Sequence, residues 1–466
     1  MNGFEPSELI PLTKRFPHRN MNTSFSFARF VSLFLISAFC FLAHTQAQTL
    51  TNIYLAVRND GIAGTGTASN PFDASTAAKY DQLLATYSQN TIFNYAAGTY
   101  QTRGWRFRTR KSAGTNCQHI GAGVDQTVIQ LVGASDPNQD GIIFGTDYDA
   151  TADGFELQNL TLDCNALGNP KFTNGLGAIG AINTAGSNIL IRGIKVIGFG
   201  TSGVGAECFV VLIAPGPALS WRSFNNITID SCIFTAPASG NKDGVTCVTI
   251  ASNAGVTLTN TSVINSWFID VASDFTFSHA LYAELCTGNY IQNCDVGAYT
   301  EPSGVQSSPW IVQNNTFVNV YFGLLLVLHS TGKVQDLEFL DNTVILMNTY
   351  TRASMAVGIA EPVESISGLR NKPQVVNVAI EGNKIQAATL TGRPNDGYTG
   401  FWVVSQNQKY FVDTLTITGN QFSGANTSNG RQIMITNAPN FVLSSQISGN
   451  SFYDGTPANV TLVPPL

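Results

Sequence analysis

A hexamer that recurs along the chain constrains the fold more than any other sequence feature. It reads apolar, two variable residues, then Asn, Cys or Ser, one variable residue and a second apolar residue, as in "ITGNQF" and "IEGNKI". Its fourth positions are Cys232, Ser266, Cys294, Asn315, Asn342, Asn383, Asn420 and Asn450, with Ile194 and Leu160 continuing the series upstream. Because the copies recur every roughly 20 to 40 residues, we expect a solenoid of stacked repeats rather than a compact globule.

The segments between the hexamers are short runs of alternating β-branched and polar residues without helical periodicity. Units this short bury their apolar face only by stacking on the next unit. The predicted fold is therefore all-β, a single-stranded parallel β-helix of roughly a dozen coils. A β-sandwich with recurring Asn turns is the less favoured alternative.

The asparagine in the hexamer has a predicted role at a bend between two strands. Asn adopts a positive φ more readily than other non-glycine residues, and its side chain forms hydrogen bonds. In coils stacked at about 4.8 Å, asparagines at one bend would form a ladder of amides. We therefore expect these residues to lie in one column and to occupy the bend conformation themselves.

Composition excludes some classes of protein. Only 12% of the residues are charged and 44% are hydrophobic, which favours an ordered chain with a large core. A net charge of −6, without a basic recognition helix, argues against nucleic-acid binding. The cysteines show no CxxC spacing, so we predict that most are buried small hydrophobes, with one or two disulfides left open.

The first 47 residues have the pattern of a secretory signal. Arg29 precedes an apolar run over 30–43 that is too short to span a bilayer comfortably, and small residues around Ala47 suit cleavage. Met21 is an alternative start. No later stretch resembles a membrane helix, so we predict a secreted protein whose β-helix domain covers 48–466.

Three segments near the start of this domain resemble a known family. "YLAVRNDGIAGTGTASNPFDAST" (54–76), "AAGTYQT" (96–102) and "HIGAGVDQTVIQL" (119–131) are similar to the opening of the right-handed β-helices of the pectate-lyase superfamily. The resemblance implies a right-handed, pectin lyase-like solenoid. It leaves activity open, because the superfamily includes lyases, hydrolases, epimerases, phage spikes and noncatalytic proteins.

A helix is expected between the first two of these segments. In "DASTAAKYDQLLATYSQ" (73–89), Asp73 or Ser75 could cap a helix with Tyr80 and Leu84 on its apolar face. We predict that this helix caps the N-terminal end of the solenoid, where strand edges would otherwise be unpaired.

Two segments contain candidate ligand-binding residues. In "RGWRFRTRK" (103–111), Arg106, Arg108 and Arg110 would project from one face of a strand and suit the carboxylates of an acidic polysaccharide; a solvated outer face is the alternative. "DPNQDGIIFGTD" (136–147) resembles a calcium loop, an ordinary acidic turn being the alternative. Its candidate Ca²⁺ ligands are Asp136, Asn138, Asp140 and Asp147.

Candidate catalytic residues lie in the middle of the solenoid. Glu207, Asp243 and His279 follow successive bend positions at nearly equal offsets, so they could stack in neighbouring coils as a general acid–base group. Lys242 would add a cation for a uronate. A surface histidine unrelated to catalysis is the alternative.

The resemblance to polygalacturonase-type hydrolases within this superfamily is incomplete. Asn241-Lys242-Asp243 resembles their Asn-x-Asp motif, but no Asp-Asp pair exists and His279 sits in Ser-His-Ala. We predict a secreted, monomeric protein that binds an acidic polysaccharide, and we leave open whether it also cleaves this ligand as a lyase or glycoside hydrolase. The alternative is a noncatalytic surface or matrix protein. Tryptophans that could stack on sugars are Trp105, Trp221, Trp310 and Trp402.

Overall fold

The computed structural model describes most of the chain after the predicted signal. The described ranges are 49–106, 114–133, 141–146, 150–173, 177–202, 208–214, 219, 222–238, 245–251, 258–271, 279–281, 284–300, 305–306, 309–327, 333–346, 355–360, 374–386, 399–404, 412–423, 431–436, 442–451 and 460–463. Leu50–Leu466 form one compact unit. None of the described helices is long and apolar enough to cross a membrane.

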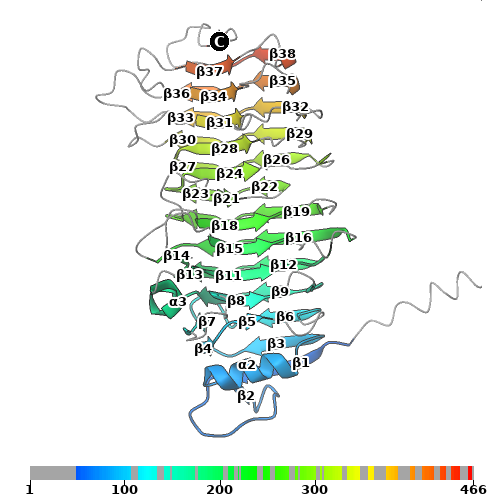
Figure 1. Cartoon of the computed structure of the whole chain (residues 1–466), viewed down its shortest axis with the longest axis vertical. Coiled ribbons are helices and arrows are strands. Elements are labelled where there is room, and N and C mark those ends of the chain that lie inside the picture. Colours follow the sequence, from blue (N-terminus) through cyan, green and yellow to red (C-terminus); the bar gives the residue numbers. More distant parts are fainter. Residues whose placement is uncertain are drawn as a thin grey trace, which may run out of the picture. The chain divides into compact units, whose positions relative to one another are not determined.

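The described strands form four sheets in which successive strands stack along the chain (Figure 1). Sheet 1 contains β1 (Thr51–Ala56), β2 (Phe72–Asp73), β3 (Thr91–Tyr95), β6 (Cys117–Ile120), β9 (Glu156–Gln158), β12 (Ile189–Arg192), β16 (Phe224–Asp230), β19 (Leu258–Ile264), β22 (Leu285–Thr287), β25 (Val305–Gln306), β26 (Trp310–Gln313), β29 (Lys333–Leu340), β32 (Gln374–Glu381), β35 (Val412–Thr418) and β38 (Val442–Ser448). Sheet 2 contains β4 (Gly98–Thr102), β7 (Thr127–Leu131), β10 (Thr161–Asp163), β13 (Lys195–Ile197), β17 (Ile233–Phe234), β20 (Trp267–Ile269), β23 (Tyr290–Gln292), β27 (Thr316–Val320), β30 (Thr343–Leu346), β33 (Lys384–Gln386) and β36 (Gln421–Ser423).

The two remaining sheets form the third face of the coil. Sheet 3 contains β5 (Trp105–Arg106), β8 (Gly141–Gly145), β11 (Ala178–Thr184), β14 (Gly200–Thr201), β15 (Cys208–Ile213) and β18 (Val245–Ile250). Sheet 4 contains β21 (His279–Leu281), β24 (Val296–Thr300), β28 (Phe322–Val327), β31 (Met355–Ala360), β34 (Thr399–Val404), β37 (Arg431–Thr436) and β39 (Val460–Val463). The short helices η1 (Ala166–Gly168) and α3 (Pro170–Thr173) lie between β10 and β11.

The chain order of the strands defines one coil. Each coil runs from sheet 1 around a first corner to sheet 2, and then to sheet 3 in the N-terminal coils or sheet 4 in the C-terminal coils. Strands of successive coils pair in parallel, for example Cys286 with Val312 and Val312 with Phe339. These three side chains are buried in one continuous core. The predicted parallel β-helix is confirmed.

The first corner contains the predicted column of asparagines. In Asn289, Asn315, Asn342, Asn383 and Asn420, the backbone N–H donates to Oδ1 of the asparagine in the next coil, at 2.8 to 3.0 Å. Their Nδ2 groups donate to the same Oδ1 atoms at 2.9 to 3.1 Å. Each Nδ2 also donates back to the preceding coil, as from Asn342 to the carbonyl of Val312 at 2.9 Å. We call the position of these residues the ladder position.

One predicted member of the column is wrong. Cys294 follows β23, so it lies at the corner between sheets 2 and 4, and the ladder position of that coil belongs to Asn289. Ser266 joins the ladder on the N-terminal side: its N–H donates to Asn289 Oδ1 at 2.9 Å, and its Oγ accepts from Cys232 N–H at 3.1 Å. Further upstream, Ile194 occupies the ladder position without an amide.

The predicted backbone role of the asparagines is also wrong. The positive φ angles belong to the residue directly before the ladder position, such as Gly193 (58°), Asn314 (54°), Asp341 (51°) and Gly419 (66°). Asn342 itself has no positive φ. The corner therefore divides two tasks between neighbours: one residue turns the backbone, and the next directs its side chain inward.

The predicted helix is α2 (Ala77–Thr86), which lies at the N-terminal end of the stack in Figure 1. Tyr80 and Leu84 are buried in the continuous core. The N-cap is Thr76, which accepts from Lys79 N–H, rather than the expected Asp73 or Ser75. Asp73 instead accepts from the ammonium of Lys79 at 2.6 Å.

The core under α2 contains a hydrogen-bonded polar chain. The hydroxyls of Tyr80 and Tyr95 are 2.9 Å apart, and the hydroxyl of Tyr95 lies 2.7 Å from Nδ1 of His119. The His119 ring stacks on Phe93, with centroids 4.6 Å apart. Burial lowers the pKa of His119 to about 3, so this imidazole is neutral in the folded protein at physiological pH.

The cysteines behave as the sequence suggests. Cys117, Cys164, Cys208, Cys232, Cys247, Cys286 and Cys294 are all free and buried. Burial raises the pKa of Cys208 and Cys232 to about 12. Because the thiolate is the reactive form, these side chains serve as small hydrophobic groups of the core.

Candidate functional site

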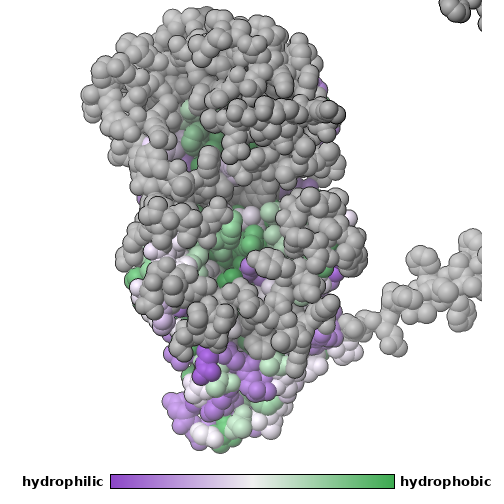
Figure 2. Space-filling model, viewed as in Figure 1, coloured by the Kyte–Doolittle hydropathy of each residue, from purple (hydrophilic) through white to green (hydrophobic). Residues whose placement is uncertain are grey.

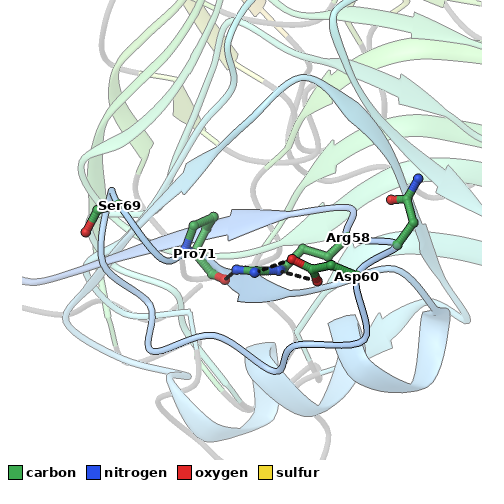
Figure 3. A pocket seen from close by; sticks show the side chains of 5 residues that line it. Arg58, Asp60, Ser69 and Pro71 are labelled. Atoms are coloured by element: carbon green, nitrogen blue, oxygen red, sulfur yellow. Dashed lines mark hydrogen bonds and ion pairs between the residues drawn. The ribbon is translucent and has the colours of Figure 1, made fainter.

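A cavity of about 580 Å³ lies beside the segment that resembles the superfamily opening, and its lining includes Arg58, Asp60, Ser69 and Pro71 (Figure 3). Arg58 donates to both carboxylate oxygens of Asp60, at 3.0 and 2.6 Å, and to the carbonyl of Pro71 at 2.9 Å. The hydrogen bond from Arg58 is the main reason that the pKa of Asp60 falls to about 2. These charged groups hold the loop together, so we assign the cavity a structural role.

The predicted catalytic residues belong to segments that enter the third face. Glu207 directly precedes β15, and Asp243 comes two residues before β18; both lie outside the described residues. β15 and β18 pair with Cys208 opposite Val245. β21 begins at His279 and lies beside β18. The backbone therefore places the starts of β15 and β18 side by side, with β21 next to β18, and the catalytic role of the three residues stays a prediction.

A carboxylate that sequence reasoning missed lies at the same edge. Asp295 directly precedes β24, in which Val296 pairs with His279 of the neighbouring coil. The Asp295 side chain is buried, with the residue 7% exposed, and its carbonyl accepts from the N–H groups of Tyr321 and Phe322. Its sequence signal is an acidic residue that directly follows a corner cysteine.

The predicted arginine row begins in the same sheet. Arg106 ends β5 and pairs with Gly145 of β8. The same lateral row continues through Asn183, Leu212 and Thr249 of the following coils. Arg108, Arg110 and Lys242 lie outside the described residues. Sheet 3 thus contains strands from both the predicted binding segment and the predicted catalytic segments.

The strands of the third face are largely uncharged where they are described. Sheet 4 has a second cluster of buried apolar residues, separate from the core, formed by Val296, Tyr299, Leu325 and Val327, with Phe322 packed against it. Hydrophobic side chains gather in the middle of the face visible in Figure 2, whereas the N-terminal end is mostly hydrophilic.

No group of three or more His, Cys, Asp or Glu side chains in the described ranges is arranged to hold a metal ion. The predicted calcium ligands Asp136, Asn138, Asp140 and Asp147 all lie outside those ranges. Calcium binding at 136–147 therefore stays a prediction.

The tryptophans that were predicted to stack on sugars differ in their positions in the structure. Trp310 is 1% exposed and fills the core, so it is unavailable to a ligand. Trp105 and Trp402 lie in β5 and β34, while Trp221 is outside the described residues. Of the two tryptophans whose side chains are described, Trp267 is the exposed one. Sequence reasoning missed it, although it directly follows the ladder position Ser266 and alternates with the buried Phe268.

Solved structures with a similar fold were found for this chain. The surface adhesin PfbA of Streptococcus pneumoniae matches with a TM-score of 0.50 and 14% identity, covering 86% of this chain and 90% of PfbA. The chain has the fold of the pectate-lyase-like right-handed β-helices.

Two enzymes show weaker likeness in fold. The A-module of mannuronan C-5 epimerase AlgE6 of Azotobacter vinelandii gives a TM-score of 0.46 at 14% identity, over 84% of this chain and 95% of that module. The endo-xylogalacturonan hydrolase of Aspergillus tubingensis gives 0.39 at 13% identity, over 88% and 99%. No family model and no curated protein matches the sequence.

Proposed function

We propose that the protein is a secreted, monomeric, polysaccharide-binding β-helix whose ligand crosses the outer surface of sheets 3 and 4. The observation that supports this best is the pairing of β15 with β18 and the position of β21 beside them. Because substrate-contacting residues on a solenoid come from successive coils, strands in register place their entering segments along one path. The signal pattern at 1–47 supports export.

The proposed ligand is an acidic glycan. Arg106 stands in the same sheet as β15 and β18, and Arg108, Arg110 and Lys242 are the further cations of these segments. A guanidinium donates two parallel hydrogen bonds to a carboxylate, so a row of arginines favours uronate units over neutral sugars.

The proposed chemistry is cleavage by general acid–base catalysis. Glu207 and Asp243 would supply the carboxylates, and His279 would exchange a proton with the sugar. Asp295 precedes the residue paired with His279, so we assign it a positioning role toward that histidine. Two neighbouring carboxylates would raise the pKa of one of them, giving a bell-shaped dependence of rate on pH.

The test measures release of reducing ends and of unsaturated uronates from polygalacturonate, alginate, xylan and β-glucan. Asp243→Asn and His279→Ala should each lower the rate about 100-fold or more. Asp295→Asn should shift the pH profile more than it lowers the maximal rate. Asp336→Asn is the matched control and should leave the rate unchanged. The carboxylate of Asp336 lies on sheet 1, where it accepts a hydrogen bond from Asn377. Full activity in both Asp243→Asn and His279→Ala would exclude this site.

A noncatalytic role is the second candidate. The described strands β15, β18, β24 and β28 contain no charged residue, so they supply no acid or base for catalysis. PfbA has the same fold and is a surface adhesin. Retained binding to an acidic glycan without turnover of any substrate would favour this candidate.

Calcium binding at 136–147 is a separate part of the proposal. A cation bound only by the folded state raises its stability. Calcium should therefore raise the Tm of the wild type, and Asp140→Ala should abolish the rise. A Tm that does not respond to calcium in the wild type would identify 136–147 as an ordinary acidic turn.

A further inference from the structure

Sheet 2 presents an aromatic pair on its outer surface, on a different face from the site proposed above. Trp267 of β20 is 52% exposed, and it pairs in register with the half-buried Tyr290 of β23 in the next coil. Their ring centroids are 5.4 Å apart, with the rings tilted by 43°.

The fold does not need these aromatic rings for its core. Phe268 and Ile291, the next residues along each strand, point inward and are fully buried. Trp267 keeps about half of its surface in water, so only part of its apolar area contributes to folding. A large ring exposed beside a second ring marks a surface for recognition more than a single scattered apolar residue does.

The lateral row that contains the pair is uncharged along its central part. From one coil to the next it runs through Ile233, Trp267, Tyr290, Thr316 and Thr343. The neighbouring row is also uncharged, with Ile269, Gln292 and Val318. The charged side chains of the first row, Lys195 and Lys384, lie at the two ends of this central part.

Those end charges are remote from the aromatic pair. Lys195 lies two coils before Trp267 and forms an ion pair with Asp125 at 3.0 Å. Lys384 lies three coils beyond Tyr290. An uncharged surface is complementary to an uncharged ligand, so an acidic glycan or a nucleic acid would find no counter-charge beside these rings.

The geometry also suits a chain of sugars. Coils repeat at about 4.8 Å, close to the length of one sugar unit in an extended chain, so rings in neighbouring coils can stack on successive sugars. The hydroxyl of Tyr290 donates to Oε1 of Gln292 at 3.3 Å, which places polar groups at the rim for sugar hydroxyls. Aromatic faces with a polar rim match the flat C–H faces of equatorially linked pyranoses.

We propose that Trp267 and Tyr290 form a second glycan-binding platform, specific for a neutral, equatorially linked polysaccharide. It takes its class of ligand from the proposed function, but its residues, face and charge preference are independent of the site on sheets 3 and 4. The platform would hold a neutral chain while an acidic chain occupies the other face.

The test measures binding of cellohexaose, xylohexaose and oligogalacturonate to the full chain by calorimetry. Trp267→Ala should weaken binding of a neutral hexasaccharide about tenfold, and Trp267→Phe should retain most of it. Leu167→Ala, at another exposed apolar side chain (55%), is the matched control. Asp243→Asn and Arg106→Ala should leave binding of the neutral probes unchanged.

Two results would overturn the platform: no binding of either neutral probe to the wild type, or equal affinity in wild type and Trp267→Ala. A second copy of the chain could occupy the same surface instead of a glycan. Light scattering tests this, because it measures whether the protein is a dimer. A dimer that Trp267→Ala dissociates, without binding of either neutral probe, would identify self-association instead. If the wild type binds the neutral probes but not oligogalacturonate, the proposed function is rejected and the platform is retained.

Discussion

The first corner of the coil is filled differently in the N-terminal and C-terminal parts of the solenoid. In the N-terminal coils the ladder position holds Leu160, Ile194 and Cys232, all fully buried. From Asn289 onward it holds amides that bond to one another. The backbone path is the same, so the corner itself does not require asparagine. Leu160 and Ile194 stabilise their coils by burial of an apolar side chain, whereas each amide also depends on the residues before and after it in the ladder.

The two parts also differ in their response to protons. The N-terminal core contains His119, a buried group that can titrate, while the ladder consists of amides that remain uncharged at every accessible pH. The comparison therefore predicts different sensitivities to mutation and to acid in the two parts.

The largest expected effect is the loss of one amide from the middle of the ladder. Asn342→Leu leaves the N–H and Nδ2 of Asn315 and the carbonyl of Val312 without their partner in a buried corner. We expect a loss of about 3–5 kcal/mol in the free energy of unfolding. Denaturant titration measures it. Ile194→Val, the matched change in the apolar part, should cost only about 1 kcal/mol; equal costs would mean that the amides do not depend on one another.

Acid should weaken the N-terminal part through His119. The unfolded chain binds a proton near pH 6.5, whereas the folded protein does so only near pH 3. This contribution to stability is complete above pH 6.5 and is lost as the pH falls toward 3. Between pH 7 and 5 the loss is about 2 kcal/mol. In His119→Phe, which keeps a ring against Phe93, the free energy of unfolding should fall less over this range. An unchanged slope would assign the acid sensitivity to other groups.

The turning residue should behave alike in both parts. Gly193 and Gly419 both have a positive φ, 58° and 66°, although their ladder neighbours are Ile194 and Asn420. Gly→Ala at either position should cost about 1 kcal/mol, because an L side chain is disfavoured in this conformation. Thermal melts of the two variants provide the comparison. A much larger cost at Gly419 would show that the ladder changes the backbone requirement.

The smallest effect is expected at the junction of the two parts. Ser266→Asn would extend the ladder by one coil, because Asn289 Oδ1 already accepts the backbone N–H of Ser266 and a carbonyl oxygen can accept a second donor. The new Nδ2 would also reach the carbonyl of Ile229, the counterpart of Val263, which accepts from Asn289. We expect a gain of about 0.5–1 kcal/mol, visible as a raised Tm. A loss of stability would show that the corner at Cys232 has no space for an amide.

Most of the fold could be predicted from the sequence because the ladder position leaves a recognisable hexamer in most of the coils. The error at Cys294 has a physical origin. Two corners of a coil are flanked by inward apolar residues, so "IQNCDV" fits the hexamer although it belongs to the other corner. The true member, Asn289, was hidden because its flanking apolar position is Cys286.

The turning residue was misassigned for a related reason. Asparagine suits both a positive φ and an inward hydrogen bond, and the sequence alone does not separate these properties. The residue before the ladder position gives the better signal, since it is Gly, Asn, Asp or Ser, as at Gly193, Asn314, Asp341 and Ser231.

The candidate site was harder to predict than the fold. Strand pairing follows local patterns, but Glu207 lies between β14 and β15 and Asp243 between β17 and β18, in segments whose lengths differ from coil to coil. Equal offsets from the ladder position therefore say little about convergence in space. The exposure of Trp267 could have been predicted from the sequence, because a residue directly after the ladder position faces outward when the next residue fills the core.

The amides of the ladder all point the same way. Each Oδ1 accepts hydrogen bonds from the asparagine of the preceding coil. A newly made coil therefore supplies the acceptor for the coil before it and not for its own N–H and Nδ2 groups. A chain that emerges amino end first thus gains the acceptor for one coil only when the following coil arrives. Assembly then resembles growth of a filament at one tip, with aligned dipoles that reinforce one another as the row lengthens. Asn450, the last member of the ladder among the described residues, is partly exposed, so water can reach its polar groups.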